Sequence, residues 1–197
     1  MDLNPSTTAV IACHFENDIV GANGAFAPFF RTQIDQRNVL DAAGRLLNGV
    51  RAKNAQVVYV RVAFQAGHSD LVSNTPLLSM VAQQGSLLDD SFGSEIINEL
   101  KPADDDWIVT NPKVSAFASS NLDERLRQAG IDTVVLFGVA TNVSVESSGR
   151  AAGDLGYRVI IASDACSAAS EEAHQATLDS FGLLGEVAST DEILSAL

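Results

Sequence analysis

The sequence predicts an α/β fold in three layers, with a six-stranded parallel sheet in strand order 3-2-1-4-5-6 between two layers of helices. Three observations predict it. Short apolar runs typical of strands alternate with segments of helical spacing. Two of these runs, 133–139 and 158–162, are continuously apolar, as in strands buried on both faces. Right-handed crossovers between parallel strands then give this order in a doubly wound sheet.

The predicted strands are runs rich in apolar and β-branched residues: 7–15, 56–64, 106–110, 133–140, 158–163 and 186–190. The segments predicted as helices are 37–54, 121–130, 143–156 and 171–184. The first carries an apolar stripe at i, i+3, i+4 and i+7, and the second opens on Asn121 as a capping residue and closes on Gly130. Two irregular stretches, 21–30 and 65–91, each follow the carboxyl end of a strand. Open α/β sheets bind ligands on that side, so we expect a pocket there.

Length and charge limit the possible classes of protein. The 197 residues are expected to form a single domain over 1–197. A net charge of −13 without a basic patch argues against binding to nucleic acid or to an anionic membrane. The sequence has no apolar run long enough to span a membrane and no signal-peptide pattern at its start, which predicts a cytoplasmic protein.

Neither a metal nor an organic cofactor is expected. The two cysteines, Cys13 and Cys166, adjoin apolar runs and are predicted to be buried free thiols. The three histidines, His14, His68 and His174, are far apart in the sequence, which disfavours a zinc site. The glycine-rich fingerprints of dinucleotide and phosphate-loop proteins are absent, so a nucleotide cofactor is not supported.

Polar residues follow three of the predicted strands at the edge where the pocket is expected. His14 follows the first strand, Asn111 the third, and Ser144 the fourth. Each also has a purely structural interpretation: a hydrogen-bonded structural histidine, a turn residue, and a serine at a helix start. Their common position at carboxyl ends favours a functional site.

Three stretches carry a resemblance to a known family: "AVIACHFENDIVG" (9–21), "VTNPKVSAF" (109–117) and "GVATNVSVESSGRAAGDLGYRVIIASDA" (138–165). With them the chain resembles the isochorismatase-like hydrolases, which include nicotinamidases and amide or carbamoyl hydrolases with a cysteine nucleophile. The resemblance extends over nearly the full length. It implies a parallel sheet flanked by helices, a small-molecule substrate, and a homodimer or larger homo-oligomer.

Members of this family typically use an Asp-Lys-Cys triad, and this sequence has a different residue at each position. Counting from Asn17-Asp18, which match the family's "QND", the aspartate position holds His14. Counting from Ser115-Ala116-Phe117, the lysine position holds Asn111, and the cysteine of the family's "TNVCVE" is Ser144. Lys113 matches a second basic position and is a candidate substrate-binding residue.

The three residues could still perform hydrolysis together. A serine hydroxyl needs a base to take its proton, and an imidazole, whose usual pKa is about 6.5, is suited to that task. The Asn111 amide could donate to a developing oxyanion. The family also places a cis peptide before the position of Ala140, and the resemblance implies an oxyanion hole from the backbone N–H groups of Ala140 and Ser144.

The same residues are compatible with two other functions. His14 could protonate a vinyl ether that water then attacks, but a dicarboxylate substrate would need basic residues such as Arg61 or Lys113. A catalytically silent family member that binds a metabolite or serves as an oligomer subunit is the main alternative to an enzyme.

Several residues are weaker candidates for binding substrate. Phe117, with Phe26, Phe29 and Phe30, could form an apolar pocket wall, although core packing or a subunit contact would explain these rings equally well. His68 could belong to a lid or be a plain loop histidine.

Overall fold

The computed structural model describes residues 1–197 and contains one six-stranded, all-parallel sheet in the order β3-β2-β1-β4-β5-β6. The predicted strand order is therefore confirmed. The strands are β1 (Thr8–Cys13), β2 (Gln56–Arg61), β3 (Trp107–Thr110), β4 (Thr133–Val139), β5 (Arg158–Ser167) and β6 (Glu186–Ala188). Every residue of β1 and β4, at the centre of the sheet, is buried. The continuously apolar run 133–139 predicts this burial for β4, and in the other such run, in β5, residues 159–162 are buried while Arg158 is exposed.

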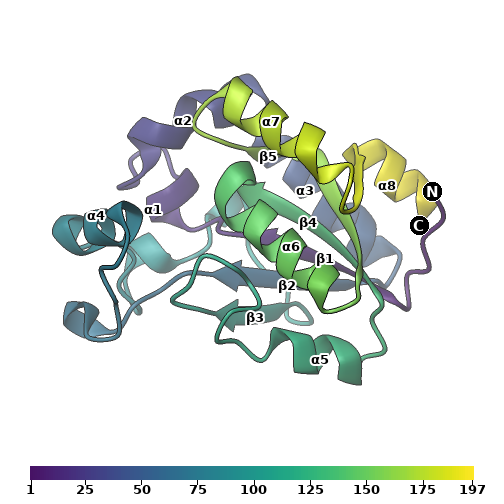
Figure 1. The fold of residues 1–197 in the computed structure, drawn as a ribbon, viewed down its shortest axis with the longest axis horizontal. Coiled ribbons are helices and arrows are strands. Elements are labelled where there is room, and N and C mark those ends of the chain that lie inside the picture. Colours follow the sequence, from purple (N-terminus) through teal and green to yellow (C-terminus); the bar gives the residue numbers. More distant parts are fainter.

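Helices cover both faces of the sheet, as predicted (Figure 1). The α-helices are α1 (Asn17–Val20), α2 (Ala27–Gln36), α3 (Val39–Ala52), α4 (Pro76–Gln84), α5 (Leu122–Gln128), α6 (Glu146–Asp154), α7 (Glu171–Phe181) and α8 (Thr190–Ala196). Helices α3 and α8 pack together on one face, and α6 lies on the other (Figure 1). Short 3₁₀ turns are η1 (Ala66–His68), η2 (Phe92–Ser94) and η3 (Asn98–Leu100). No helix is both long and apolar enough to cross a membrane.

Some strands end at other residues than the sequence predicts, because local contacts determine where a strand ends and the apolar pattern does not show them. Strand β1 stops at Cys13 because His14 adopts a left-handed φ of 59°. Strand β5 runs on to Ser167 through an irregularity in its pairing with β4. The predicted strand at 186–190 ends at Ala188, since Ser189 caps helix α8 instead.

The predicted helices also shift. Asn121 makes no side-chain cap, so that expectation for α5 was wrong. The helix expected from 143 begins as a π-turn, η4 (Thr141–Val145), before α6. The two stretches expected to be irregular contain all of α4 and the start of α2. Each of these helices has a proline in its first turn, which is a helix-start signal.

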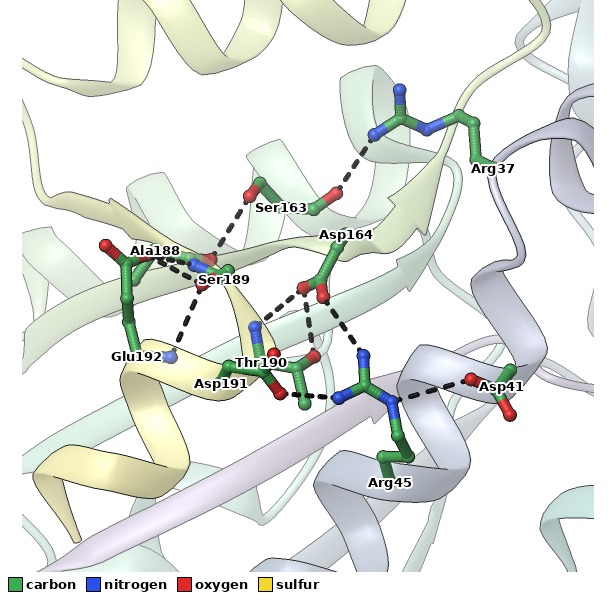
Figure 2. Close-up of polar contacts among 10 residues, drawn as sticks. All are labelled: Arg37, Asp41, Arg45, Ser163, Asp164, Ala188, Ser189, Thr190, Asp191 and Glu192. Atoms are coloured by element: carbon green, nitrogen blue, oxygen red, sulfur yellow. Dashed lines mark hydrogen bonds and ion pairs between the residues drawn. The ribbon is translucent and has the colours of Figure 1, made fainter.

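Asp164, in the irregular part of β5, fixes the start of the C-terminal helix (Figure 2). Its Oδ1 accepts hydrogen bonds from the Thr190 backbone N–H at 2.7 Å and from the Thr190 hydroxyl at 2.9 Å. Arg45 of α3 lies 3.7 Å from its other oxygen and also pairs with the exposed Asp41. Because Thr190 is fully buried, loss of this carboxylate leaves its polar groups without a partner.

We therefore expect Asp164→Ala to lower the free energy of unfolding by about 2 kcal/mol. The matched control is Asp41→Ala, which removes an ion pair to the same arginine from a carboxylate that is 77% exposed. This control should change stability by less than about 0.5 kcal/mol. Urea denaturation measures both values, and equal effects would contradict the role given to Asp164.

Candidate active site

His14 lies at the carboxyl end of β1 and is 5% exposed. Its backbone N–H donates to the Val60 carbonyl at 2.9 Å, which ties this residue to β2. The imidazole Nδ1 is 3.5 Å from Glu16 Oε1, and Nε2 has no hydrogen-bond partner in the protein. The left-handed backbone turns the chain out of the sheet directly after the strand.

Glu16, which the sequence reasoning missed, is a fully buried acid beside His14. Its Oε1 also accepts a hydrogen bond from the Val62 backbone N–H at the end of β2, while Oε2 has no partner. The available signal was a carboxyl group two residues after the histidine at a strand end. This signal is weak, because acidic residues in loops are usually exposed.

Ser144 lies in the π-turn that follows β4. This turn begins after a cis peptide between Val139 and Ala140, which the family resemblance implied. The Ser144 hydroxyl donates to the Val139 carbonyl at 3.0 Å, and the Ala140 carbonyl is 3.4 Å away. It therefore does not cap the helix, and it makes no hydrogen bond to His14.

The backbone of this turn is held close to β1. Gly138 has a φ of 131°, and a Cβ there would lie 2.0 Å from the Cys13 carbonyl oxygen, so only glycine fits. The carbonyl of Ala140 accepts hydrogen bonds from the N–H groups of Val143 and Val145, at 3.1 and 3.2 Å. The N–H of Ala140 itself donates to no acceptor in the protein and is free for a ligand.

Asn111 is buried at the end of β3, but it does not line the cavity beside His14 and Ser144. Its Nδ2 donates to the Ser115 carbonyl at 2.8 Å, and its Oδ1 has no partner. The side chain thus holds its own loop together. The structure does not bring its amide donor to the expected oxyanion position.

His14 and Ser144 both line a cavity of about 110 Å³ at the carboxyl edge of the sheet. Thirteen of the 16 lining residues are hydrophobic, and the polar ones are His14, Lys113 and Ser144. Lys113 makes no ion pair or hydrogen bond. Part of the cavity wall comes from the stretches 21–30 and 65–91, which the sequence predicts to lie beside the pocket. The apolar lining residues are Ile19, Phe26, Phe30, Val62, Phe64, Leu77, Leu78, Val81, Leu87, Val114, Val139, Ala140 and Val143.

Three other sequence-predicted candidates lie outside this cavity. The Phe117 ring packs against Tyr157 with 6.0 Å between ring centroids. His68 Nε2 is 2.8 Å from the Ser86 carbonyl oxygen, and its ring lies beside Phe64. Arg61 forms an ion pair with Asp89 at 2.6 Å. None of these three residues lines the cavity, whereas Phe26 and Phe30, two of the other predicted rings, do.

The two cysteines are fully buried free thiols, as predicted. Burial raises the pKa of the Cys166 thiol to about 12, and it also raises the pKa of Cys13 strongly. Neither residue lines the cavity. Because a thiol must ionise to act as a nucleophile, neither cysteine is suited to replace the family's catalytic cysteine.

His174 of α7 contacts Thr141, the first residue of the π-turn η4. Its Nδ1 is 2.8 Å from the Thr141 hydroxyl, and its Nε2 is 2.7 Å from Arg37 Nη2. Since a guanidinium can only donate, Nε2 must be the acceptor, and the proton of the neutral ring lies on Nδ1. Burial and the nearby Arg37 lower the pKa of His174 to about 4.

This low pKa predicts a pH-dependent stability. In the unfolded chain the histidine titrates near pH 6.5, so between pH 6.5 and 4 the unfolded state binds more protons than the folded state. The stability contributed by neutral His174 is therefore present above pH 6.5 and is lost as the pH falls toward 4. We expect a loss of about 2 kcal/mol between pH 7 and pH 5 that is missing in His174→Gln. Urea denaturation at both pH values measures it, and His68→Gln is the control that should keep the wild-type loss.

Comparisons with known proteins show the family and the fold of the chain. The isochorismatase domain family matches residues 8–192. The isochorismatase family protein YecD of Escherichia coli O157:H7 is 32% identical over 198 residues, which cover 100% of both chains. The isochorismatase family protein YwoC of Bacillus subtilis is 39% identical over 163 residues, 82% of this chain and 85% of that protein. The crystal structure of a cysteine hydrolase from Pseudomonas syringae superposes with a TM-score of 0.90 at 27% identity, covering 100% of this chain and 94% of the other.

Proposed function

The chain belongs to the isochorismatase family, and on that premise we propose that it hydrolyses a small, mostly apolar acyl compound with Ser144 as nucleophile and His14 as its base. One observation carries this proposal. His14 and Ser144 follow two adjacent strands, β1 and β4, and line the same apolar cavity. The unpartnered Nε2 of His14 is the ring nitrogen that would take the serine proton.

The reaction would proceed in two halves. The Ser144 Oγ adds to the substrate carbonyl carbon while its proton passes to His14 Nε2, and the carbonyl oxygen becomes an oxyanion. His14 then gives this proton to the leaving group, which departs and leaves an acyl-serine. Water attacks that ester, His14 takes the water's proton, and the proton returns to Ser144 as the acid is released. Before the first step, the Ser144 hydroxyl must turn away from the Val139 carbonyl.

Two groups would stabilise the charge that forms in the cavity. The free N–H of Ala140 is available for the oxyanion, together with the backbone at Ser144. Lys113 is the one lining residue that carries a fixed positive charge, and it would orient the oxyanion or one anionic group of the substrate. Asn111 is not assigned a donor role here, because its amide is bonded within its own loop.

The cavity limits the substrate class. Its volume of about 110 Å³ holds the equivalent of three to four water molecules, which suits a small acyl group. A dicarboxylate is disfavoured, since Arg61 is engaged by Asp89 and leaves Lys113 as the single lining cation. Among esters, amides, carbamates and vinyl ethers, we therefore expect turnover of small neutral or singly charged esters or amides. A homodimer or larger homo-oligomer stays a prediction.

One observation favours a second candidate reaction at the same site. The Ser144 hydroxyl donates to Val139 and makes no hydrogen bond to His14. If this arrangement persists with substrate bound, His14 would act on water directly, and Ser144 would only stabilise the turn. A hydrolase panel of the four compound classes, run with wild-type protein, Ser144→Ala and His14→Ala, tests both reactions. No turnover of any compound by wild-type protein would instead support a silent, ligand-binding family member.

A further inference from the structure

Glu16 presents an unusual arrangement in the interior of the protein. The residue is fully buried, and no lysine or arginine forms an ion pair with it. One carboxyl oxygen is within 3.5 Å of His14 Nδ1 and also accepts the Val62 N–H, while the other has no partner. A buried carboxyl group without a full set of partners is costly, so its presence requires an explanation.

A structural role alone explains only part of this arrangement. Accepting the Val62 N–H joins the end of β2 to the segment after β1. A glutamine side chain has the same length and could accept that N–H with its carbonyl oxygen, without a buried charge. The backbone contact therefore does not by itself require a carboxylate at this position.

We propose that Glu16 is a positioning residue for His14: its carboxylate keeps the proton of the neutral ring on Nδ1 and stabilises the imidazolium formed when Ser144 reacts. With the proton on Nδ1, Nε2 has a free lone pair for the serine proton. The arrangement is a Ser-His-Glu series, and the inference rests on the proposed function of Ser144 and His14. At 3.5 Å the contact is long for a hydrogen bond, and attraction to a positively charged ring would shorten it.

Glu16→Gln separates the two roles of this side chain. We expect kcat to fall by roughly 10²-fold with KM changed less than about threefold, because the lost charge acts on the His14 ring and not on the bound substrate. Thermal stability should stay equal or rise, since a buried charge is removed while the Val62 contact is kept. The matched control is Asp18→Asn, in which another carboxyl group accepts a backbone N–H, that of Leu87, without contacting a histidine. Its kcat should stay within about threefold of wild type.

A second measurement needs no substrate. Long-range ¹H–¹⁵N spectra of wild-type protein at pH 8, assigned with His14→Ala, report which ring nitrogen of His14 carries the proton. We expect the Nδ1–H form. The Nε2–H form, or a kcat for Glu16→Gln equal to that of wild type, would overturn the inference and leave the proposed function standing. If wild-type protein hydrolyses no compound, the proposed function itself fails, and the catalytic role of Glu16 fails with it.

Discussion

His14→Ala is expected to lower kcat for ester or amide hydrolysis by roughly 10³-fold or more, with KM changed only a few-fold. The side chain lies in the cavity wall with Nε2 unpartnered, and no other lining residue can accept a proton near neutral pH. Without the imidazole, the serine hydroxyl keeps its proton and remains a weak nucleophile. Steady-state kinetics on the best substrate of the hydrolase panel measure both constants.

His68→Ala is the matched control for this variant. His68 is a loop histidine that lies outside the cavity, where its ring contacts Ser86 and Phe64. The control should retain kcat within about threefold of wild type. Equal activity of His14→Ala and wild-type protein would remove His14 from the mechanism altogether.

Ser144→Ala should lower kcat on the same scale as His14→Ala, and the double variant should be little worse than either single variant. A nucleophile and its base act as one unit, so removing the second adds little once the first is gone. Folding should survive, with a loss of about 1 kcal/mol for the hydrogen bond from the hydroxyl to the Val139 carbonyl. Kinetics and urea denaturation of all three variants provide the measurements.

Two other patterns would change the account. If Ser144→Ala keeps full turnover while His14→Ala loses it, the serine only stabilises the turn and His14 acts on water. If neither substitution affects hydrolysis, the activity belongs to another part of the protein.

The sequence predicts the sheet well because its central strands are buried, and buried strands are recognisable by their apolar residues. The continuously apolar runs 133–139 and 158–162, now in β4 and β5, favour strands covered on both faces, and the alternation with helices predicts the strand order. Strand ends were predicted less well. Residues such as His14 and Ser189 end a strand through a single backbone angle or a side-chain cap, which periodicity does not reveal.

The sequence predicts a residue's place in the candidate site only where the position of that residue after a strand is enough to bring it to the cavity. His14 and Ser144 meet in one cavity because they follow adjacent strands. Side-chain direction is decided by local partners, so Asn111 turns to the Ser115 carbonyl and Phe117 to Tyr157. The role of Glu16 is not predictable from the sequence, because its burial depends on contacts with the end of β2, which is far away in the sequence.

The most direct test of the central claim is covalent labelling of Ser144. A small, uncharged alkyl fluorophosphonate reacts with an activated serine by displacement of fluoride, and intact-protein mass spectrometry followed by peptide mapping locates the adduct. We expect one adduct per chain, on Ser144, that forms much more slowly in His14→Ala and is absent in Ser144→Ala. Wild-type protein that hydrolyses its substrate yet gains no adduct on Ser144 would contradict the serine mechanism.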